Sequence, residues 1–566
     1  MASKITVFNP EGYPPKVTAR GMAPGIENLQ GKTVALIGTG MENSDKFMVE
    51  LQASLAEHAP GVKTKLIPWP DIFNMHLINS DDAAQRFKHV RGEADAAVLG
   101  IGCCPGCTPA VVVNQLEMES AYGLPTIGVH TAQFERLATS RTRVGGLASA
   151  RQAIIPTTGM NKSPEELRAF IEGDDPVAGR PFWEQILETL TRRIPDAELR
   201  GVGFDRSTPR FLEAATEEEL HQLFRERRYT DFLPIVLPTE ERVEAMLRGT
   251  SHARDEIVGR LQPSGAQEAW AFDVEKVAVN AVMAGAAPEH FPVILALAAT
   301  NDTGRDASGV SIARMVVVNG PIRNEIGMNY GTGAMGPYNY ANSAIGRAYG
   351  LLSQNLQGGS VPGQTYHGSL GNNFSYNNCT YAENEENSPW EPLHVRRGFR
   401  ADESTVTTFF MWGNIWSEHV RPNWKEQLPA MLSGLDPAGG VTLVMDPIVA
   451  QEFVDRGMDT PETLANWIYE NARVPARLYW DHVPLSNVAR GLVANGVEPY
   501  ASYSKLGPDE LIPPFMPMQV EVVVTGGSTN GSWNVFSATS MARQTNEEAA
   551  VGITFGRTTR SVDVWR

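Results

Sequence analysis

Hydrophobic and polar positions form short alternating blocks over the first part of the chain. Four short apolar runs predict strands, at residues 32–37, 62–67, 95–101 and 126–130. Helices are predicted between them, over residues 44–57 and 108–122. Strands that alternate with helices form parallel sheets, which bind ligands beyond the carboxyl ends of their strands. The pattern therefore predicts an α/β fold, with a Rossmann-like parallel-sheet domain over residues 1–165.

The pattern changes twice further along the chain. Residues 166–262 are charged and helical in spacing, and Ser163 and Thr216 each precede the acidic start of a predicted helix. We expect this segment to be a charged helical connector. Beyond it, apolar elements are predicted at residues 275–286, 290–299, 315–318 and 522–524, around a Gly/Asn-rich tract at 319–387. Residues 263–566 are therefore expected to form a second, larger α/β domain whose Gly/Asn-rich loops line a pocket.

The composition indicates a globular protein with a large core. The 566 residues are 42% hydrophobic and include 48 basic and 65 acidic side chains, for a formal net charge of −17. An acidic chain without a basic stripe is not expected to bind nucleic acid. No apolar run of about 18 residues occurs, and the first residues lack the apolar core of a signal peptide. We therefore expect no membrane association, a cytoplasmic location and, as for many large α/β enzymes, a symmetric homo-oligomer.

Three of the four cysteines lie within five residues, between a predicted strand and a predicted helix. They are Cys103, Cys104 and Cys107. Thr108 is the expected N-cap of the helix, so unpaired backbone N–H groups and the positive end of the helix dipole would stabilise a thiolate there. Cys104 and Cys107 also have the C-x-x-C spacing of redox dithiols.

Three interpretations of the cysteine cluster are open. The cysteines can be small buried hydrophobic residues, although three in one loop of a cysteine-poor chain argue against this. They can bind zinc or iron, with a histidine as a further ligand. A nucleophilic or redox-active thiolate in a reducing cytoplasm, with no tightly bound cofactor, is the favoured interpretation.

A dense polar cluster lies at residues 372–394. Aromatic side chains are interleaved with its carboxylates and amides, which indicates an ordered pocket-lining loop rather than a disordered acidic segment. Glu383 and Glu386 are candidates for a general acid or base, and His394 for a proton shuttle. Residues of these types are more often surface or structural groups. The candidates for binding a substrate are Arg323, Arg347, His367 and Asn378.

Two glycine-rich turns resemble dinucleotide-binding motifs only in part. Gly38 and Gly40 follow the first predicted strand, but Asn43 replaces the third glycine of G-x-G-x-x-G. Residues 331–336 satisfy the motif, yet they lie well beyond their strand, and no acidic residue follows about 20 positions later to hold a ribose. A tight turn or an anion cradle explains this loop, and we expect no nicotinamide cofactor.

The cysteine loop and the helix after it resemble a known family. The residues that carry the resemblance are Cys104-Pro105-Gly106-Cys107-Thr108, Leu116-Glu117 and Gly123-Leu124-Pro125-Thr126-Ile127. They resemble the UGSC family of (seleno)proteins, in which a U-G-S-C-T motif follows a strand and the next helix ends in LE…G-x-P-T. A more distant similarity is to the selenocysteine-bearing component B of glycine, sarcosine and betaine reductases. Residues 277–292, 318–347 and 382–399 also resemble long members of the family.

The resemblance implies roles for the cysteines. Cys104 falls at the selenocysteine position and would attack carbon, while Cys107 would resolve the adduct by forming a disulfide. The expected protein is a thiol-dependent oxidoreductase that cleaves a carbon–heteroatom bond in a small organic substrate, with thioredoxin or a small thiol as reductant. Pro105 and Gly106 depart from the motif, and Cys103 is an additional thiol. The alternatives are a metal-dependent hydratase, hydrolase or lyase on Cys103, Cys104 and Cys107, and a non-catalytic redox-sensing protein.

Overall fold

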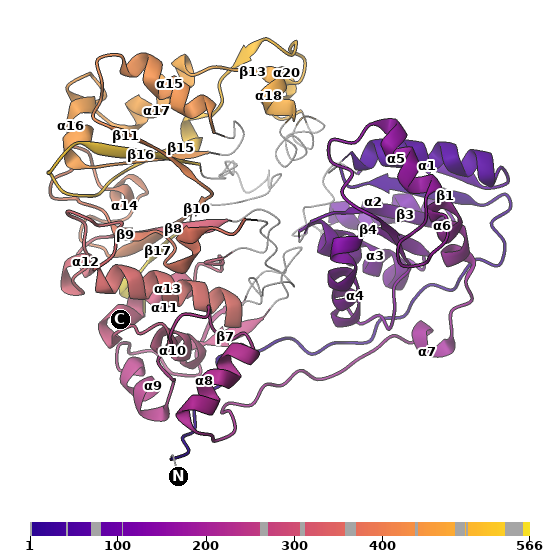
Figure 1. Ribbon diagram of the computed structural model, residues 1–566, viewed down its shortest axis with the longest axis horizontal. Coiled ribbons are helices and arrows are strands. Elements are labelled where there is room, and N and C mark those ends of the chain that lie inside the picture. The colour runs from indigo at the N-terminus through magenta and orange to yellow at the C-terminus, as the bar shows by residue number, and fades with distance from the viewer. Residues whose placement is uncertain are drawn as a thin grey trace.

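The computed structural model describes residues 3–40, 43–69, 81–104, 106–260, 270–305, 312–356, 370–435, 440–481, 493, 496–537 and 558–566. These residues form two bodies, each with hydrophobic cores of its own (Figure 1). An N-terminal parallel sheet and its helices make the first body, and two further sheets with their helices make the second. The predicted mixed α/β fold is confirmed.

The first body is built on five parallel strands. They are β1 (Thr33–Gly38), β2 (Lys63–Leu66), β3 (Ala96–Gly102), β4 (Thr126–Thr131) and β5 (Gln152–Ile155), and they lie in the order β2-β1-β3-β4-β5. The helices are α1 (Ser44–His58), α2 (Asp81–Glu93), α3 (Cys107–Ala121), α4 (Glu135–Val144), α5 (Pro164–Glu172) and α6 (Phe182–Thr191). Side chains of α1, α5 and α6 pack on one face of the sheet, and those of α2 and α3 on the other. Because both faces are covered, β3 and β4 are buried along their whole length.

Helix α3 starts directly at the cysteine loop. Its first residue is Cys107 and its N-cap is Gly106, so the expectation that Thr108 caps the helix is wrong. The sulfur of Cys104 takes the place of a capping oxygen, since it accepts the Cys107 N–H at 2.9 Å. At the other end, Gly123 follows the C-cap with a φ of +58°, a left-handed conformation that glycine adopts without steric cost.

The second body contains two four-stranded sheets. Their strands are β8 (Ala313–Asn319), β9 (Thr380–Ala382), β10 (Thr405–Met411), β11 (Asn414–Glu418), β12 (Val441–Met445), β15 (Val520–Val524), β16 (Ser532–Ser537) and β17 (Thr558–Ser561). One sheet has the order β17-β10-β8-β9 and the other β11-β16-β12-β15. Side chains of β8, β9 and β10 meet side chains of β12, β15 and β16 in a shared apolar core, so the two sheets pack face to face.

Helices cover the outer face of each of these sheets. The first sheet is covered by α10 (Val274–Met283), α11 (Phe291–Ala298) and α13 (Tyr340–Asn355). The second is covered by α15 (Trp424–Ser433), α16 (Pro447–Val454) and α17 (Pro461–Asn471). The second body is therefore a helix–sheet–sheet–helix stack (Figure 1).

The helices of the segment between the two bodies pack partly into the core of the first body and partly into that of the second. Helices α5 and α6 pack against the first sheet, whereas α8 (Glu217–Glu226) and α9 (Glu240–Leu247) pack into the core of the second body. The N-terminal arm also joins the second body, because Ile5 pairs with Ala215 and Tyr13 with Ala271. Ser163 and Thr216 form capping boxes at the starts of α5 and α8, as their sequence context predicts.

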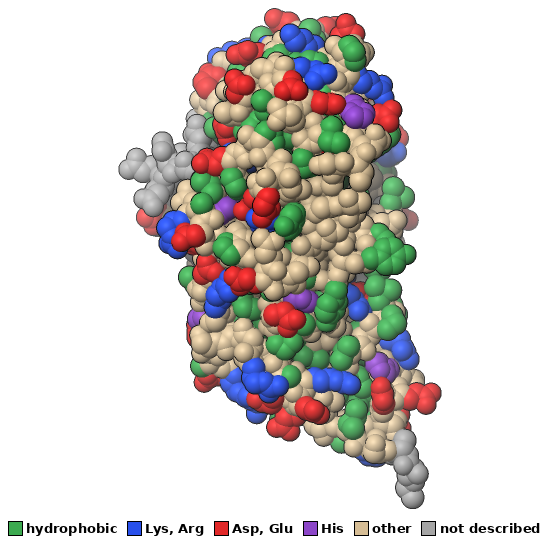
Figure 2. All heavy atoms as spheres, turned by 90° about the vertical axis from the view of Figure 1, so that its left-hand side faces the viewer, with side chains coloured by type: hydrophobic (Ala, Val, Ile, Leu, Met, Phe, Trp, Pro, Cys, Tyr) green, Lys and Arg blue, Asp and Glu red, His purple; other side chains and the backbone are tan. Residues whose placement is uncertain are grey.

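The remaining helices and strands are short. They are α7 (Asp196–Leu199), α12 (Ile322–Glu325), α14 (Leu393–Arg396), α18 (Ala476–Asp481), α20 (Tyr500–Tyr503), β6 (Ile257–Arg260), β7 (Ala271–Asp273), β13 (Val474–Pro475) and β14 (Leu511–Ile512). Within the described parts of the chain, no helix combines the length and the apolar character needed to cross a bilayer. On the face of the second body in Figure 2, acidic and basic side chains are interspersed, without a continuous basic stripe.

Candidate functional sites

The cysteine loop connects the carboxyl end of β3 to the first turn of α3. Cys104 and Cys107 form a disulfide, with their Cα atoms 5.0 Å apart. Cys104 is partly exposed, whereas Cys107 is 1% exposed and packs into the core on the α1 side of the sheet. Cys103 is buried in the same core. The loop therefore holds one accessible and two buried sulfurs.

The two sulfurs of the disulfide have different environments. Cys104 Sγ lies at the N-terminus of a 15-residue helix, where the Cys107 N–H and the helix dipole stabilise negative charge. Cys107 Sγ is shielded from water, and burial favours a protonated thiol after reduction. An accessible sulfur that favours the thiolate and a buried sulfur that favours the thiol suit a nucleophile and a resolving thiol.

A second polar cluster forms where the carboxyl ends of β8, β9 and β15 meet. Thr525 Oγ1, just after β15, donates to Ala382 O at 2.8 Å. Asn384 Nδ2, just after β9, donates to Gly526 O at 2.9 Å. Four residues named from the sequence lie in this cluster: Arg323, Glu383, Glu386 and His394.

Glu383 is the most deeply buried acid of the cluster. Its Oε2 accepts hydrogen bonds from Asn319 Nδ2 at 2.5 Å and from the Leu393 N–H at 2.8 Å. Burial raises the pKa of Glu383 to about 7, against the smaller opposing effect of these hydrogen bonds. This carboxyl group can therefore hold a proton near neutral pH and act as an acid.

The other members of the cluster bind one another. Arg323 donates to Glu385 Oε2 at 3.0 Å and to the two oxygens of Glu386 at 2.8 and 2.9 Å. The hydrogen bond with Arg323 also lowers the pKa of Glu386. His394 is fully buried, with Nδ1 4.0 Å from Glu385 Oε1, and neither ring nitrogen has a hydrogen-bond partner. The carboxylates that Arg323 binds in this structure are those of its own neighbours.

Arg347 and Asn378 lie outside this cluster. Arg347, on α13, donates to the two oxygens of Asp231 at 2.9 and 3.1 Å. Asn378 is fully buried, accepts the Arg314 N–H at 3.3 Å and donates to Gly346 O at 3.0 Å. Both therefore have structural partners. His367 lies outside the described residues.

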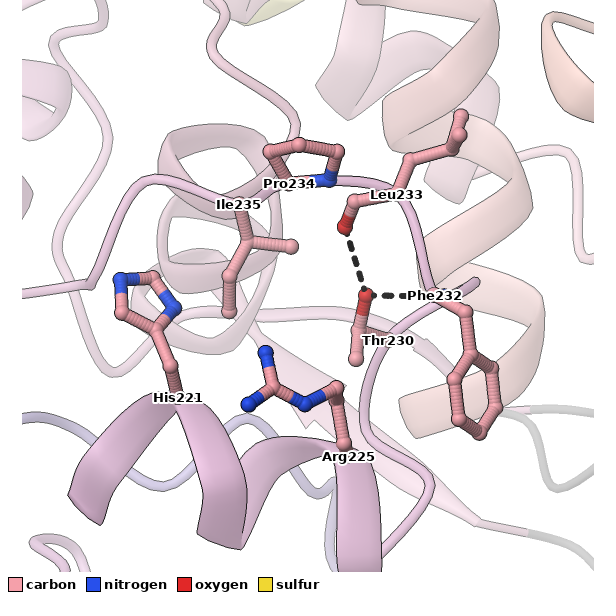
Figure 3. Close-up of a pocket in the computed structure, with 7 residues that line it drawn as sticks. All are labelled: His221, Arg225, Thr230, Phe232, Leu233, Pro234 and Ile235. Carbon is pink, nitrogen blue, oxygen red and sulfur yellow. Dashed lines mark hydrogen bonds between the residues drawn. The ribbon is translucent and has the colours of Figure 1, made fainter. Parts of the chain in front are cut away.

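A surface pocket of about 300 Å³ lies beside the Asp231–Arg347 pair. His221 and Arg225 of α8 form one wall, and the loop 230–235 forms the other (Figure 3). The loop is closed by Thr230, whose hydroxyl donates to Leu233 O and accepts the Phe232 N–H (Figure 3). Of the candidate residues named from the sequence that the structure describes, none lines this pocket.

The glycine motif at 331–336 is a tight turn. Asn339 Nδ2 donates to the carbonyl oxygens of Gly333 and Gly336 at 2.8 and 2.9 Å. The N–H groups of Ala334 and Gly336 are used within the turn itself. The glycine-rich turn after β15 packs on it, because the Gly526 N–H donates to Tyr330 O at 2.9 Å. Of the two explanations for this motif, the structure shows the turn.

Comparison with known proteins identifies the first body. The UGSC family model matches residues 6–175, a range that includes the whole parallel sheet, the cysteine loop and α3. These residues belong to the UGSC family. No curated protein matches the chain. The similarity to component B of the glycine, sarcosine and betaine reductases stays an expectation.

The UGSC domain holds a histidine that sequence reasoning did not single out. His130 lies on β4, opposite Gly102 of β3. It is fully buried, and neither ring nitrogen has a hydrogen-bond partner. Burial lowers the pKa of His130 to about 3, so the ring is neutral. The sequence did contain one indication of this residue, because His130 ends the predicted strand that follows the cysteine loop and its helix.

The cysteines of the UGSC domain do not form a set of three thiolates in this structure. Two of the three are joined in the disulfide, and disulfide sulfurs are not the thiolate ligands that zinc or iron requires. Among the described residues, three metal-binding side chains approach one another at Glu57, His58 and Glu172. Arg168 already binds both of these carboxylates, at 2.7 Å each. A metal on the cysteines is therefore an alternative for the reduced form only.

Proposed function

We propose that the protein is a thiol-dependent oxidoreductase whose Cys104–Cys107 pair cycles between a disulfide and a dithiol. The observation that supports this most directly is the disulfide at the N-terminus of α3, with Cys104 Sγ accepting the Cys107 N–H. Membership of residues 6–175 in the UGSC family is compatible with such a role. The pair meets the main requirement of thiol redox chemistry, an accessible sulfur whose thiolate is stabilised.

Cys104 is the nucleophile in this proposal, and Cys107 is the resolving thiol. The Cys104 thiolate attacks an electrophilic carbon of a small organic substrate, and the heteroatom leaves with the electron pair of the broken bond. Cys107, as a thiolate, then attacks the Cys104 sulfur. The carbon fragment leaves with the electron pair of the sulfur–carbon bond and takes up a proton. Two thiols become one disulfide, and the carbon is reduced by two electrons.

A second thiol compound must reopen the disulfide after each cycle. An external thiolate, from thioredoxin or a small thiol, attacks Cys104 because this is the accessible sulfur of the pair. Cys107 is then the leaving group. A reducing cytoplasm would supply such reductants, and no tightly bound cofactor is required.

The proposal assigns acid–base work in the second body to Glu383 and His394. A buried carboxyl group with a pKa of about 7 can donate a proton at neutral pH and take it back. Arg323 and Glu386 hold this cluster together through their ion pair.

Selective alkylation tests the proposal. The reduced native protein is treated at pH 7 with less than one equivalent of iodoacetamide, and the labelled residue is mapped by mass spectrometry. Label is expected on Cys104, because Cys103, Cys107 and Cys379 are all buried. A Cys379→Ser variant is the matched control and should give the same pattern. Equal labelling of all four cysteines in the folded protein, or a Cys104 that does not react, would contradict the proposal.

A further inference from the structure

The surface pocket beside α8 has two walls of different chemistry. His221 and Arg225 lie one turn apart on α8, and Figure 3 shows both side chains extending from the helix toward the loop 230–235. The wall formed by this loop carries apolar side chains, from Phe232 to Ile235. A cationic wall that faces an apolar wall fits a ligand with one anionic end and an apolar body.

Both basic side chains of the pocket have hydrogen-bond donors to offer a ligand. The guanidinium group of Arg225 is exposed, and it has no ion-pair or hydrogen-bond partner among the residues that the structure describes. His221 makes a long contact, with Nε2 3.8 Å from Oε1 of the largely exposed Glu217. Arginine is always charged and presents its N–H groups as a planar fork, which matches the two oxygens of a carboxylate.

The acidic residue of the loop does not offset this charge. Asp231 accepts hydrogen bonds from Arg347 at 2.9 and 3.1 Å and lies 3.5 Å from Arg305 Nη2. Its side chain is 4% exposed, and it is not among the residues that line the pocket. The negative charge of Asp231 is therefore paired on the α13 side of the loop, away from Arg225.

The loop is fixed in place without a ligand. Gln354 and Asn355 of α13 donate to the carbonyl oxygens of Thr230 and Tyr229 at 3.2 and 2.9 Å. The Thr230 hydroxyl donates to Leu233 O at 3.3 Å and closes the loop from inside. A wall that is already ordered reduces the entropy lost when a ligand binds.

The loop also leaves apolar surface in contact with water. Phe232 is 63% exposed and has a φ of +66°, a conformation that is rare for an aromatic residue, and Leu233 is 41% exposed. A ligand that covers these side chains removes apolar surface from water. The pocket volume of about 300 Å³ is at the lower end of the range for small-molecule sites. The apolar body of the ligand is therefore small, of the size of a phenyl ring or a short alkyl chain.

We propose that this pocket binds a small organic monocarboxylate. Arg225 and His221 hold the carboxylate group, and the apolar body packs on Phe232, Leu233 and Ile235. A phosphate group fits less well, because the apolar wall offers no partner for its second charge and further oxygens. The residues that line the pocket in the described part of the chain include no thiol and no carboxyl group, so the ligand is bound and not converted. The inference goes beyond the proposed function, because this pocket lies in the second body and the disulfide in the first.

The test is a titration of the full-length protein with phenylacetate, followed by saturation-transfer difference NMR. Phenylacetate should bind with a dissociation constant in the millimolar range or below. Acetate lacks the apolar body and 2-phenylethanol lacks the charge, so each should bind at least about tenfold more weakly. Arg225→Met should raise the dissociation constant of phenylacetate by a similar factor. Its unfolding midpoint in urea should equal that of the wild type, because Arg225 is exposed.

The matched control is Arg227→Met. This variant makes the same change of charge at the C-cap of α8, outside the lining of the pocket, and should bind phenylacetate as the wild type does. Phenylacetate binding that is absent, or that is unchanged in Arg225→Met, would overturn the inference. Equal binding of 2-phenylethanol, or displacement of phenylacetate by inorganic phosphate, would overturn the assigned ligand class. If Arg225→Met does not fold, these two competition experiments on the wild-type protein decide the question.

Discussion

The two polar sites of the protein differ in how the chain builds them. The cysteine loop takes its reactive groups from a few consecutive residues between β3 and α3, and it leaves Cys104 partly exposed. The carboxylate cluster joins Arg323, just after β8, to Glu383, Glu386 and His394 from the later segment 383–394, and it pairs most of its charges with one another. Reactivity needs an accessible group, whereas a buried charge network needs internal partners.

This difference separates what a substitution should change at each site. In the cysteine loop, a substitution should remove chemistry and leave stability nearly intact. In the carboxylate cluster, loss of one ionic partner should cost stability directly.

The largest effect is expected for Cys104→Ser. Loss of the nucleophile should reduce the rate of thiol–disulfide exchange with oxidised glutathione by at least about a thousandfold. The turnover of a substrate, once one is identified, should fall by the same factor. The unfolding midpoint in urea should stay close to that of the wild type. Cys379→Ser removes a thiol in the second body and should leave the exchange rate unchanged. Thiol–disulfide exchange that persists in Cys104→Ser would refute the role of Cys104 as nucleophile. A wild-type protein that exchanges disulfides but turns over no substrate would favour a redox sensor.

Arg323→Met should have the reverse profile. It leaves Glu385 and Glu386 without the guanidinium group that binds both, and breaking a largely buried pair costs about 3 kcal/mol. Arg400→Met is the control in the same body, because its pair with Asp402 is exposed and screened by water, so its loss should change stability very little. Urea unfolding measures both. Equal losses in the two variants would contradict the account of the cluster.

Glu383 should make stability depend on pH. Its folded pKa of about 7 is above the ordinary value of 4.5, so the native state keeps a proton that the unfolded chain has lost between these values. Stability should therefore fall as the pH rises through this window, by up to about 3 kcal/mol, since one pKa unit corresponds to about 1.4 kcal/mol.

In Glu383→Gln, the amide cannot ionise and this part of the fall should be absent. Urea unfolding of both proteins at pH 5 and pH 7.5 measures the difference. Parallel changes in the free energy of unfolding would show that Glu383 is ionised in the native protein at neutral pH.

The smallest effects are expected at two helix caps, one in each body. Ser163→Ala and Thr216→Ala each remove the side chain that accepts an N–H at the start of α5 or α8, at a cost of about 1 kcal/mol. Thermal unfolding of the two variants should show similar losses, with no change in thiol exchange. A large loss of thermal stability in only one variant would show that the capping box contributes more to the stability of one body than to that of the other.

The sequence predicted the first body closely because its signals are local. The four predicted strands and the two helices predicted between them each lie within one residue of the structure, whereas β5, α2 and α4 were not predicted. The exception is the cap of α3, where the Cys104 sulfur replaces the Thr108 hydroxyl that was expected to accept the N–H. A cysteine sulfur is not among the usual capping groups, so composition offered no sign of it.

The second site could be predicted only as a list of residues. Glu383, Glu386 and His394 were predicted from one polar segment, whereas Arg323 was named apart from them as a substrate-binding candidate, and the structure brings it to Glu386. The partners of Arg347 and Asn378 also depend on how distant strands and helices pack. The pairing of the two sheets has no local sequence signal either, because it depends on contacts between distant segments. His130 was missed for a related reason, since a single histidine has no spacing that distinguishes it from a core residue.

The central claim is that Cys104 and Cys107 form a reversible disulfide, and counting thiols tests it most directly. Protein purified without reductant is denatured and alkylated, with and without prior reduction, its intact mass is measured, and metal is assayed on the same sample. The account predicts two thiols that become alkylatable only after reduction, mapping to Cys104 and Cys107. Four free cysteines together with one equivalent of zinc or iron would contradict it and favour the metal-dependent alternative.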